Sequence, residues 1–375
     1  MAQKLINNTV STKSPEVATH PELDLLLCCS RTQINTTTAK SIKTLVESNI
    51  NWAHLIQMAD RHGVLPLLYQ SLNSTCSEVV PQTILNQLRL RFQTNALYTL
   101  FLSEELIKLL NLFETHQIPA IPFKGSILAA SVYGDLALRQ FVDIDILVRE
   151  QDFLKTEALL ITQGYQLKLQ YDWEQCFVDD NRQIEVDIHQ GIAPSYFPFY
   201  LDFEGLWQRL QSVPLLETTV VSFSPEDLLL ILCVQVAKDC WEKLGRLEKL
   251  IKVCDIAQVI QAYPELNWQG VIETANKLGG LRMLYFGLIL ARELVGATLP
   301  PEIELNVQAD SVAVSLAAQV CRNFFENVND SADIASRQDF NLSAMMQRFI
   351  FYIRIREKLS NKIQYVCDFV RQELI

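Results

Sequence analysis

The chain has 375 residues, of which 49% are apolar and 20% charged, and its formal net charge is −11. This composition excludes a disordered chain, and the low content of glycine and proline excludes a collagen-like one. The excess of acidic residues disfavours long nucleic acid as a partner, because binding to a phosphate backbone needs positive charge. The length predicts two or three domains.

The first 20 residues are polar and lack the apolar stretch of a signal peptide, so residues 1–20 are predicted to form a flexible tail. Nine cysteines occur without any C-x-x-C pair, a pattern typical of reduced thiols packed inside a cytosolic protein. The most apolar segments are too short or too charged to span a bilayer. We therefore expect a cytoplasmic protein without a membrane partner.

Apolar residues recur at helical spacing over the next part of the chain, which predicts an N-terminal helical region at residues 21–114. Pro81 begins a long predicted helix that continues towards Phe113. No cluster of carboxylates or histidines that would indicate a site stands out in this region.

The pattern changes at Thr115, where alternating segments and turn signals replace helical spacing. In chain order we predict an extended run, a short helix, a strand, a longer helix and three strands. They lie at residues 117–122, 127–132, 142–148, 150–164, 165–171, 174–178 and 183–189. Residues 115–214 are therefore predicted to form a mixed sheet with helices, in the order β-α-β-α-β-β-β.

Helical spacing returns at Ser224-Pro-Glu-Asp227, which combines an N-cap serine, a proline at the first helical position and acids in the first turn. Further helical patterns follow, so residues 215–375 are predicted to form a C-terminal helical domain. The predicted fold class is α+β, with a mixed sheet domain flanked by N- and C-terminal helical regions.

Two aspartates interrupt the apolar strand predicted at residues 142–148. Asp143 and Asp145 are two positions apart, so they face the same side of the strand at about 7 Å from each other. Like charges this close are costly unless a cation neutralises them, and strands disfavour aspartate. Mg²⁺ prefers carboxylate oxygens together with substrate phosphates, so the pair predicts a magnesium site. The alternative is an edge strand with a solvated acidic face.

A later strand offers a third carboxylate. Glu185, Asp187 and His189 alternate with apolar residues and therefore share one face of this strand. Two metal ions held by three carboxylates can clamp the attacking and leaving oxygens of a phosphoryl transfer. Either Asp187 or Glu185 can be the third carboxylate, and any amphipathic strand shows the same alternation.

A Gly-Ser turn precedes both acidic strands. Gly125 and Ser126 lie between the extended run and the short helix, where glycine lets the backbone approach a bound group closely. The amides that follow such a turn suit a phosphate. A tight turn with serine as the helix cap is the alternative explanation.

Together, Phe123-Lys-Gly-Ser126, Asp143-Ile-Asp145 and Asp187 resemble the nucleotidyltransferase superfamily with a polymerase-beta-like palm. Lys124-Gly-Ser-Ile-Leu128, Arg139 and Asp143-Ile-Asp-Ile-Leu-Val148 are more closely similar to the uncharacterised bacterial nucleotidyltransferases. They are also similar to the toxin-type nucleotidyltransferases of abortive-infection systems, which usually have Gly-Gly-Thr where this chain has Gly-Ser. The resemblance is strongest over residues 118–191.

The resemblance implies a metal-binding role for the acidic residues. Asp143, Asp145 and Asp187 would hold two Mg²⁺ ions, with Mn²⁺ as an alternative ion and Glu185 as an alternative to Asp187. Asp187 would also help to deprotonate an acceptor hydroxyl. His189 would bond the third carboxylate.

The resemblance also implies contacts with the phosphates of a nucleoside triphosphate. Gly125 and Ser126 would hold the β- and γ-phosphates, and Lys124 and Arg139 would balance their charge. Two further candidate phosphate contacts are the basic residues of the following helix, Lys238 and Lys243.

The predicted function is Mg²⁺-dependent transfer of a nucleoside monophosphate from an NTP to a hydroxyl of a tRNA, a protein or a small molecule. Two alternatives stay open: a catalytically silent palm that acts as a binding or regulatory module, and a helical interaction protein with incidental acidic strands. From sequence alone, Asp145→Asn is expected to remove transfer activity and leave folding intact, because it removes one of two neighbouring like charges.

Overall fold

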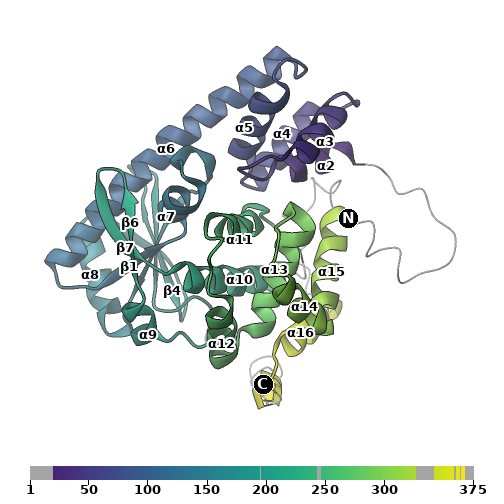
Figure 1. Ribbon diagram of the computed structural model, residues 1–375. Helices are drawn as coiled ribbons and strands as arrows, with labels where there is room; N and C mark the ends of the chain where they lie inside the picture. Colours follow the sequence, from purple (N-terminus) through teal and green to yellow (C-terminus); the bar gives the residue numbers. More distant parts are fainter. Residues whose placement is uncertain are drawn as a thin grey trace.

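The computed structural model describes residues 20–194, 196–242, 246–326, 342–358, 360–363 and 365–367. All but the last residue of the predicted tail, and also Lys243, lie outside the described residues. The described chain confirms the predicted α+β class, because a mixed sheet with helices follows one set of helices in the sequence and precedes another. Figure 1 shows the sheet to one side of these two sets.

The N-terminal part of the molecule consists of α2 (Pro21–Cys29), α3 (Thr36–Val46), α4 (Trp52–Arg61), α5 (Leu65–Cys76) and α6 (Gln82–Thr115). Asn35 and Asn51 precede α3 and α4, and their side chains accept hydrogen bonds from amides of the first turn. These caps fix where both helices begin. α6 begins directly after Pro81 and is 34 residues long, so it continues from the N-terminal helices along the sheet (Figure 1).

The central sheet contains β1 (Ala120–Phe123), β2 (Asp143–Val148), β3 (Gln166–Gln170), β4 (Glu174–Asp179) and β5 (Ile184–His189). Its strand order is β1-β2-β5-β4-β3, in which β2 and β5 are parallel and the other neighbours antiparallel. The two strands that carry acids in the sequence are therefore direct neighbours.

Short helices connect these strands. They are α7 (Gly125–Leu128), the π-helix η1 (Ala129–Tyr133), the 3-10 helices η2 (Leu136–Leu138) and η3 (Glu150–Asp152), and α8 (Phe153–Thr162). The observed order of strands and helices agrees with the β-α-β-α-β-β-β prediction.

The sheet region extends beyond the predicted boundary at Pro214. After α9 (Phe203–Gln208), the chain forms a hairpin of β6 (Gln211–Leu215) and β7 (Thr218–Ser222). The hairpin contributes side chains to the same apolar cluster as the sheet, and the Ser222 hydroxyl donates a hydrogen bond to the Pro122 carbonyl (2.7 Å). The C-terminal helices therefore begin after Ser222, and we call residues 115–222 the palm.

The two faces of the sheet differ in polarity because side chains alternate along each strand. Ile144, Ile146 and Val148 of β2, with alternate residues of β5, pack against α8 and the second half of α6. We call this cluster the palm core. The opposite face of the same strands carries the acids and faces the C-terminal helices.

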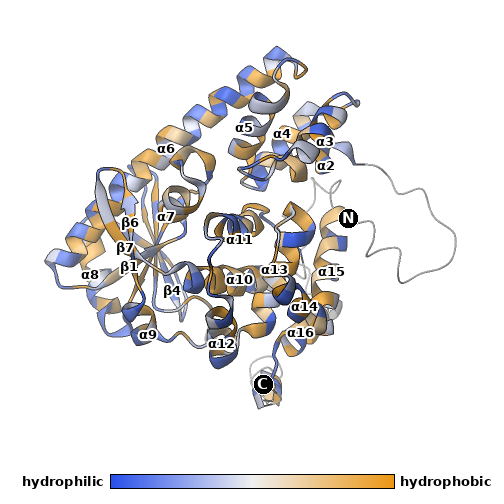
Figure 2. Ribbon diagram, in the orientation of Figure 1, coloured by the Kyte–Doolittle hydropathy of each residue, from blue (hydrophilic) through white to orange (hydrophobic). Residues whose placement is uncertain are grey.

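The C-terminal part consists of α10 (Pro225–Glu242), α11 (Ile251–Ala262), α12 (Trp268–Leu278), α13 (Leu281–Val295), α14 (Pro301–Ala309), α15 (Ser311–Glu326) and α16 (Leu342–Ile355). α10 begins as predicted, because the Ser224 hydroxyl accepts a hydrogen bond from the Asp227 amide (3.2 Å). α10 and α13 pack against each other and are largely apolar in Figure 2.

Buried side chains of the C-terminal helices form one cluster with those of α2, α4 and α5. The N- and C-terminal helices therefore share a core, which we call the helical core, although the palm separates them in sequence. Within the described part of the chain, no helix combines the length and apolar character needed to cross a membrane.

Candidate active site

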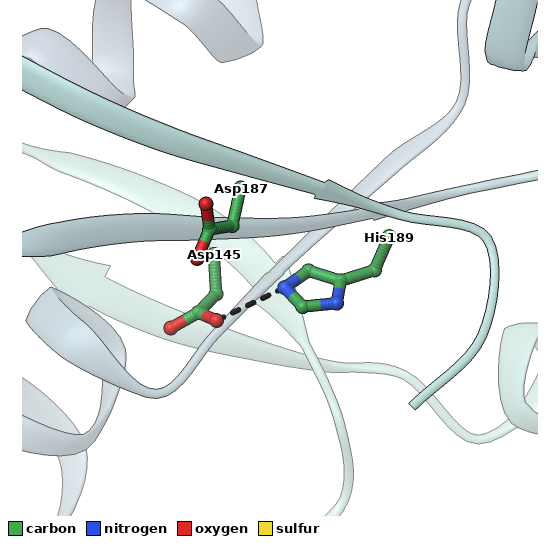
Figure 3. Close-up of side chains that lie close together, drawn as sticks. All are labelled: Asp145, Asp187 and His189. Carbon is green, nitrogen blue, oxygen red and sulfur yellow. Dashed lines mark hydrogen bonds and ion pairs between the residues drawn. The ribbon is translucent and has the colours of Figure 1, made fainter. Parts of the chain in front are cut away.

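Two aspartates lie side by side on the polar face of the sheet. Asp145 of β2 is directly paired with Asp187 of β5, and Asp143 is paired with Glu185 two residues earlier along the same strands. Figure 3 shows the carboxylates of Asp145 and Asp187 close together, with the ring of His189 directed at Asp145. One potential ligand atom from each of these three residues lies within 4.8 Å of the other two.

The Asp187 carboxylate has an unused oxygen. Its Oδ1 atom is buried and has no hydrogen-bond partner in the part of the chain that the structure describes. Burial, followed by the nearby charges of Asp145 and Asp143, raises the pKa of Asp187 to about 8. Burial and then Asp145 also raise the pKa of Asp143. A divalent cation would reverse both effects, so these oxygen donors fit a hard cation such as Mg²⁺.

Asp145 differs from Asp187 because it already has two partners. The Lys124 ammonium donates a hydrogen bond to Asp145 Oδ1 (2.7 Å), and His189 Nε2 lies 3.0 Å from the same oxygen. Burial alone would raise the pKa of Asp145, but Lys124 and His189 hold it well below its usual range. The sequence predicts a bond from His189 to the third carboxylate, whereas the structure shows it with Asp145.

The other ring nitrogen of His189 faces a further carboxylate that the sequence analysis did not identify. His189 Nδ1 lies 3.3 Å from Glu174 Oε2 on β4, at ion-pair distance but without the geometry of a hydrogen bond. Glu174 is also paired across the strands with His189. The ring therefore lies between two carboxylates and is buried, with 1% of its surface exposed.

An unusual turn places Lys124 at Asp145. Lys124 has φ 57° and Gly125 has φ 29°, and a non-glycine residue adopts such a conformation only where its surroundings fix it. A Cβ atom on Gly125 would make only ordinary contacts, 3.5 Å from the Asp143 carbonyl oxygen and the Phe141 ring, so the positive φ rather than lack of space favours glycine here. Ser126 is buried, and its Oγ lies 2.9 Å from Ser103 Oγ of α6.

Arg139 has a partner on the C-terminal helices. Its guanidinium donates two hydrogen bonds to the Asp255 carboxylate of α11 (2.9 and 2.8 Å), and the Tyr133 hydroxyl donates a third (2.8 Å). Burial opposes the charge of Arg139, but Asp255 outweighs it and raises the pKa of Arg139 above its usual value. Asp255 therefore balances the charge that the sequence analysis assigned to a triphosphate.

Two other candidates also have partners. Glu185 accepts a hydrogen bond from Lys168 of the exposed edge strand β3 (3.1 Å). The ammonium of Lys238 lies 4.1 Å from the centre of the Trp173 ring and 3.5 Å from Asp239 Oδ1, in a buried position. Cys176, which the sequence analysis assigned only to packing, lies with Glu185 and Asp187 in a second group of potential ligands.

A cavity of about 160 Å³ is lined by Asp143 and Asp145, whereas Asp187 does not line it. The palm, the end of α4, α10, α11 and the loop before α11 form its walls, so both helical regions contribute to the site. Its charged lining residues are Asp60, Arg61, Lys124, Arg139, Asp143, Asp145, Lys249, Lys252 and Asp255. A second cavity is lined by His54, Gln57, Met58, Asp60, Arg61 and Gln140, three of which also line the first.

Comparison with known proteins identifies a family for most of the chain. A family model described as "Uncharacterised nucleotidyltransferase" matches residues 48–296, a range that includes the palm and all residues lining both cavities. No curated protein matches the chain. With well over half of its length matched, the chain belongs to the family of uncharacterised nucleotidyltransferases.

Proposed function

We propose that the protein transfers a nucleoside monophosphate from an NTP to a hydroxyl group of an acceptor, with release of pyrophosphate. The observation that supports this function most is the pairing of Asp145 with Asp187, one of whose oxygens has no partner, in a nucleotidyltransferase fold. Asp143 lines the adjoining cavity from the same face of the sheet.

Asp143, Asp145 and Asp187 are the proposed metal ligands. Asp187 is preferred to Glu185 because Glu185 is bonded to Lys168, whereas Asp187 has an unused oxygen beside Asp145. The proposed ions are two Mg²⁺, and the nearby His189 nitrogen makes Mn²⁺ an alternative. When bound, such ions would polarise the reacting phosphoryl group and offset the charge of the triphosphate.

The residues of the chain would move one proton and orient the triphosphate. The acceptor oxygen forms a bond to the α-phosphorus, and the bond from this phosphorus to the bridging oxygen breaks. Pyrophosphate leaves with the bonding electrons, and the Asp187 carboxylate accepts the proton of the acceptor hydroxyl. Lys124 would turn from Asp145 to the triphosphate once a cation balances that carboxylate.

The Gly125 turn and Arg139 have supporting roles in this proposal. The turn directs Lys124 into the cavity, and a phosphate contact by the amides of Gly125 and Ser126 stays a prediction. Arg139 fixes the segment before β2 to α11 through Asp255. The acceptor is a hydroxyl of a tRNA end, a protein side chain or a small molecule, and long nucleic acid is not expected.

Incubation with each labelled NTP and Mg²⁺, with and without cell extract, tests the proposal. We expect release of labelled pyrophosphate from γ-labelled NTP and transfer of label from α-labelled NTP to one class of acceptor. The variants Asp145→Asn and Asp187→Asn should lose both signals, and Asp180→Asn, an equal change at an exposed turn, should keep them. Nucleotide binding without any transfer would instead support the silent palm.

A further inference from the structure

Most charged groups around the larger cavity are paired within the protein. Lys124 is paired with Asp145, Arg139 with Asp255, and Lys252 with Asp239, which does not line the cavity. Asp60 lies 3.3 Å from the guanidinium of Arg91. Within each of these four pairs the opposite charges cancel, so the pairs leave little net charge to attract a ligand.

Three charged residues at the cavity have no such partner. No described residue forms an ion pair or a side-chain hydrogen bond with Asp143, Arg61 or Lys249. Both cations are exposed, and both line the cavity together with Asp143. One free carboxylate and two free cations match a complex of a divalent cation with a polyphosphate, in which positive and negative charge lie together.

The two cations reach the cavity from segments far apart in the sequence, and a direct contact fixes these segments. Arg61 ends α4, and the carbonyl of the next residue, His62, accepts a hydrogen bond from the Ile251 amide at the start of α11 (3.0 Å). Gly63 has φ 71°, and a Cβ atom there would lie 3.1 Å from Ile251 Cγ2. The close approach requires glycine, and it holds Arg61 and Lys249 at one cavity.

We propose that Arg61 and Lys249 form a polyphosphate subsite that receives the β- and γ-phosphates of the NTP and the pyrophosphate product. The inference deepens the proposed function and rests on it for the identity of the substrate. It gives the N-terminal helical region a direct part in substrate binding. Since Gly125 and Ser126 are buried and do not line the cavity, side-chain cations are better placed to contact the terminal phosphates.

Titration of the full chain with inorganic tripolyphosphate tests the subsite without any need for turnover. The variants are Arg61→Gln, Lys249→Gln and the double variant, and the control is the double variant Lys40→Gln/Arg89→Gln, which makes the same charge change at exposed positions away from the cavity. Binding is measured by calorimetry with Mg²⁺ and with EDTA. An NTP and the matching nucleoside monophosphate are titrated in parallel arms.

We expect each single variant to raise the Kd for tripolyphosphate several-fold and the double variant by about tenfold or more, because each cation supplies a charge-assisted hydrogen bond. The Kd for NTP should rise in parallel, and the Kd for the monophosphate should change little. Equal binding of tripolyphosphate by the double variant and the control would overturn the inference, as would a wild-type protein that binds NTP but not tripolyphosphate. If wild type binds tripolyphosphate through these residues but transfers no nucleotide, the subsite stands and the proposed function fails.

Discussion

The palm differs from the N- and C-terminal helices, which together we call the helical body, in how far apart in the sequence its core residues lie. The palm core draws its residues from one continuous stretch between Leu102 and Val220, in which strands alternate with helices. The helical core combines Leu23–Leu88 with residues from Ile192 to Tyr365, so it needs both ends of the chain, and it also includes palm residues such as Phe123 and Leu147. The palm core thus comes from one stretch of the chain that is inserted between the two sets of helices, whereas the helical core joins segments far apart in the sequence.

This difference separates the residues proposed for chemistry from those proposed for substrate binding. The proposed metal ligands all belong to the palm, but unpaired cations beside them come from α4 and from the segment before α11. A sheet face that carries acids cannot pack on an apolar core without cost, so the contact between palm and helices contains a polar cavity. The following experiments test this division, from the largest expected effect to the smallest.

If the chemistry belongs to the palm alone, Asp145→Asn should reduce the rate of nucleotide transfer by about a thousandfold or more, since a lost metal ligand costs several kcal/mol. The structure changes the expectation for folding. The Asn oxygen could still accept from Lys124 and His189, but the negative charge opposite the Lys124 ammonium would be lost, so the free energy of unfolding should fall by about 1–3 kcal/mol. Pyrophosphate release and urea denaturation measure the two effects. A variant with wild-type activity would show that the metal assignment is wrong.

The buried pair of Arg139 and Asp255 should decide whether palm and helical body unfold together. Arg139→Met leaves Asp255 buried without its cation, which should cost about 3–5 kcal/mol and split one calorimetric transition into two. The double variant Arg139→Met/Asp255→Leu should recover most of the loss, because it removes both charges. If the double variant is as unstable as the single one, the ion pair does not join the two bodies.

The contact between α6 and the palm should depend on pH. Glu105 accepts hydrogen bonds from Tyr165 (2.8 Å) and Arg182 (2.7 Å); burial opposes its ionisation, but these partners lower the pKa of Glu105. Its stabilising effect is therefore present above the unfolded-state pKa and lost as pH falls through the lower folded-state pKa. Glu105→Gln should cost about 1–2 kcal/mol at pH 7, since Arg182 is partly exposed, and less at pH 4.

Urea denaturation at both pH values measures the effect of Glu105→Gln. Glu104→Gln is the matched control, because it changes an exposed neighbour on the same helix. A destabilisation of Glu105→Gln that does not shrink at pH 4 would exclude ionised Glu105 as its source.

The smallest expected effect is an increase in stability. Without metal, Asp187→Asn removes a carboxylate crowded by Asp145 and Asp143, so in EDTA the unfolding free energy should rise by about 1 kcal/mol. Glu185→Gln, two residues earlier on β5, should leave the unfolding free energy unchanged, because the ion pair of Glu185 with Lys168 is exposed. A lower melting temperature for Asp187→Asn would show that the metal-free carboxylate has a stabilising partner.

Alternation of side chains predicts much of the palm from the sequence. It locates β2 and β5 and assigns Asp143, Asp145, Asp187 and His189 to polar faces, which the parallel pairing then joins. It does not predict which acid bonds His189, because that depends on rotamers and on the approach of Lys124 from the turn after β1. The β6–β7 hairpin also lacked a signal, since Leu216 has φ 54° where a glycine or asparagine would have marked the turn.

The helical core was beyond prediction for a different reason. Helical periodicity identifies individual helices but gives no information about which distant helices pack together. The hydrogen bond between His62 and Ile251, or that between the Thr32 hydroxyl and the Gln258 side chain (2.6 Å), joins segments that the whole palm separates. The cavity between palm and helices, and the two free cations in it, follow only from these contacts.

The length of α6 has a mechanical consequence. Leu85 and Leu88 lie in the helical core, the segment from Leu102 to Phe113 lies in the palm core, and the whole helix extends about 51 Å. Both ends of α6 are packed, one in the helical core and the other in the palm core. The palm and the helical body therefore cannot rotate relative to each other about the axis of α6 without twisting this helix. The Thr94 hydroxyl bonds back to the Leu90 carbonyl between these two packed segments, a contact that favours bending there. The width of the cavity between the two bodies should therefore depend on the curvature of α6 as well as on the pair of Arg139 and Asp255.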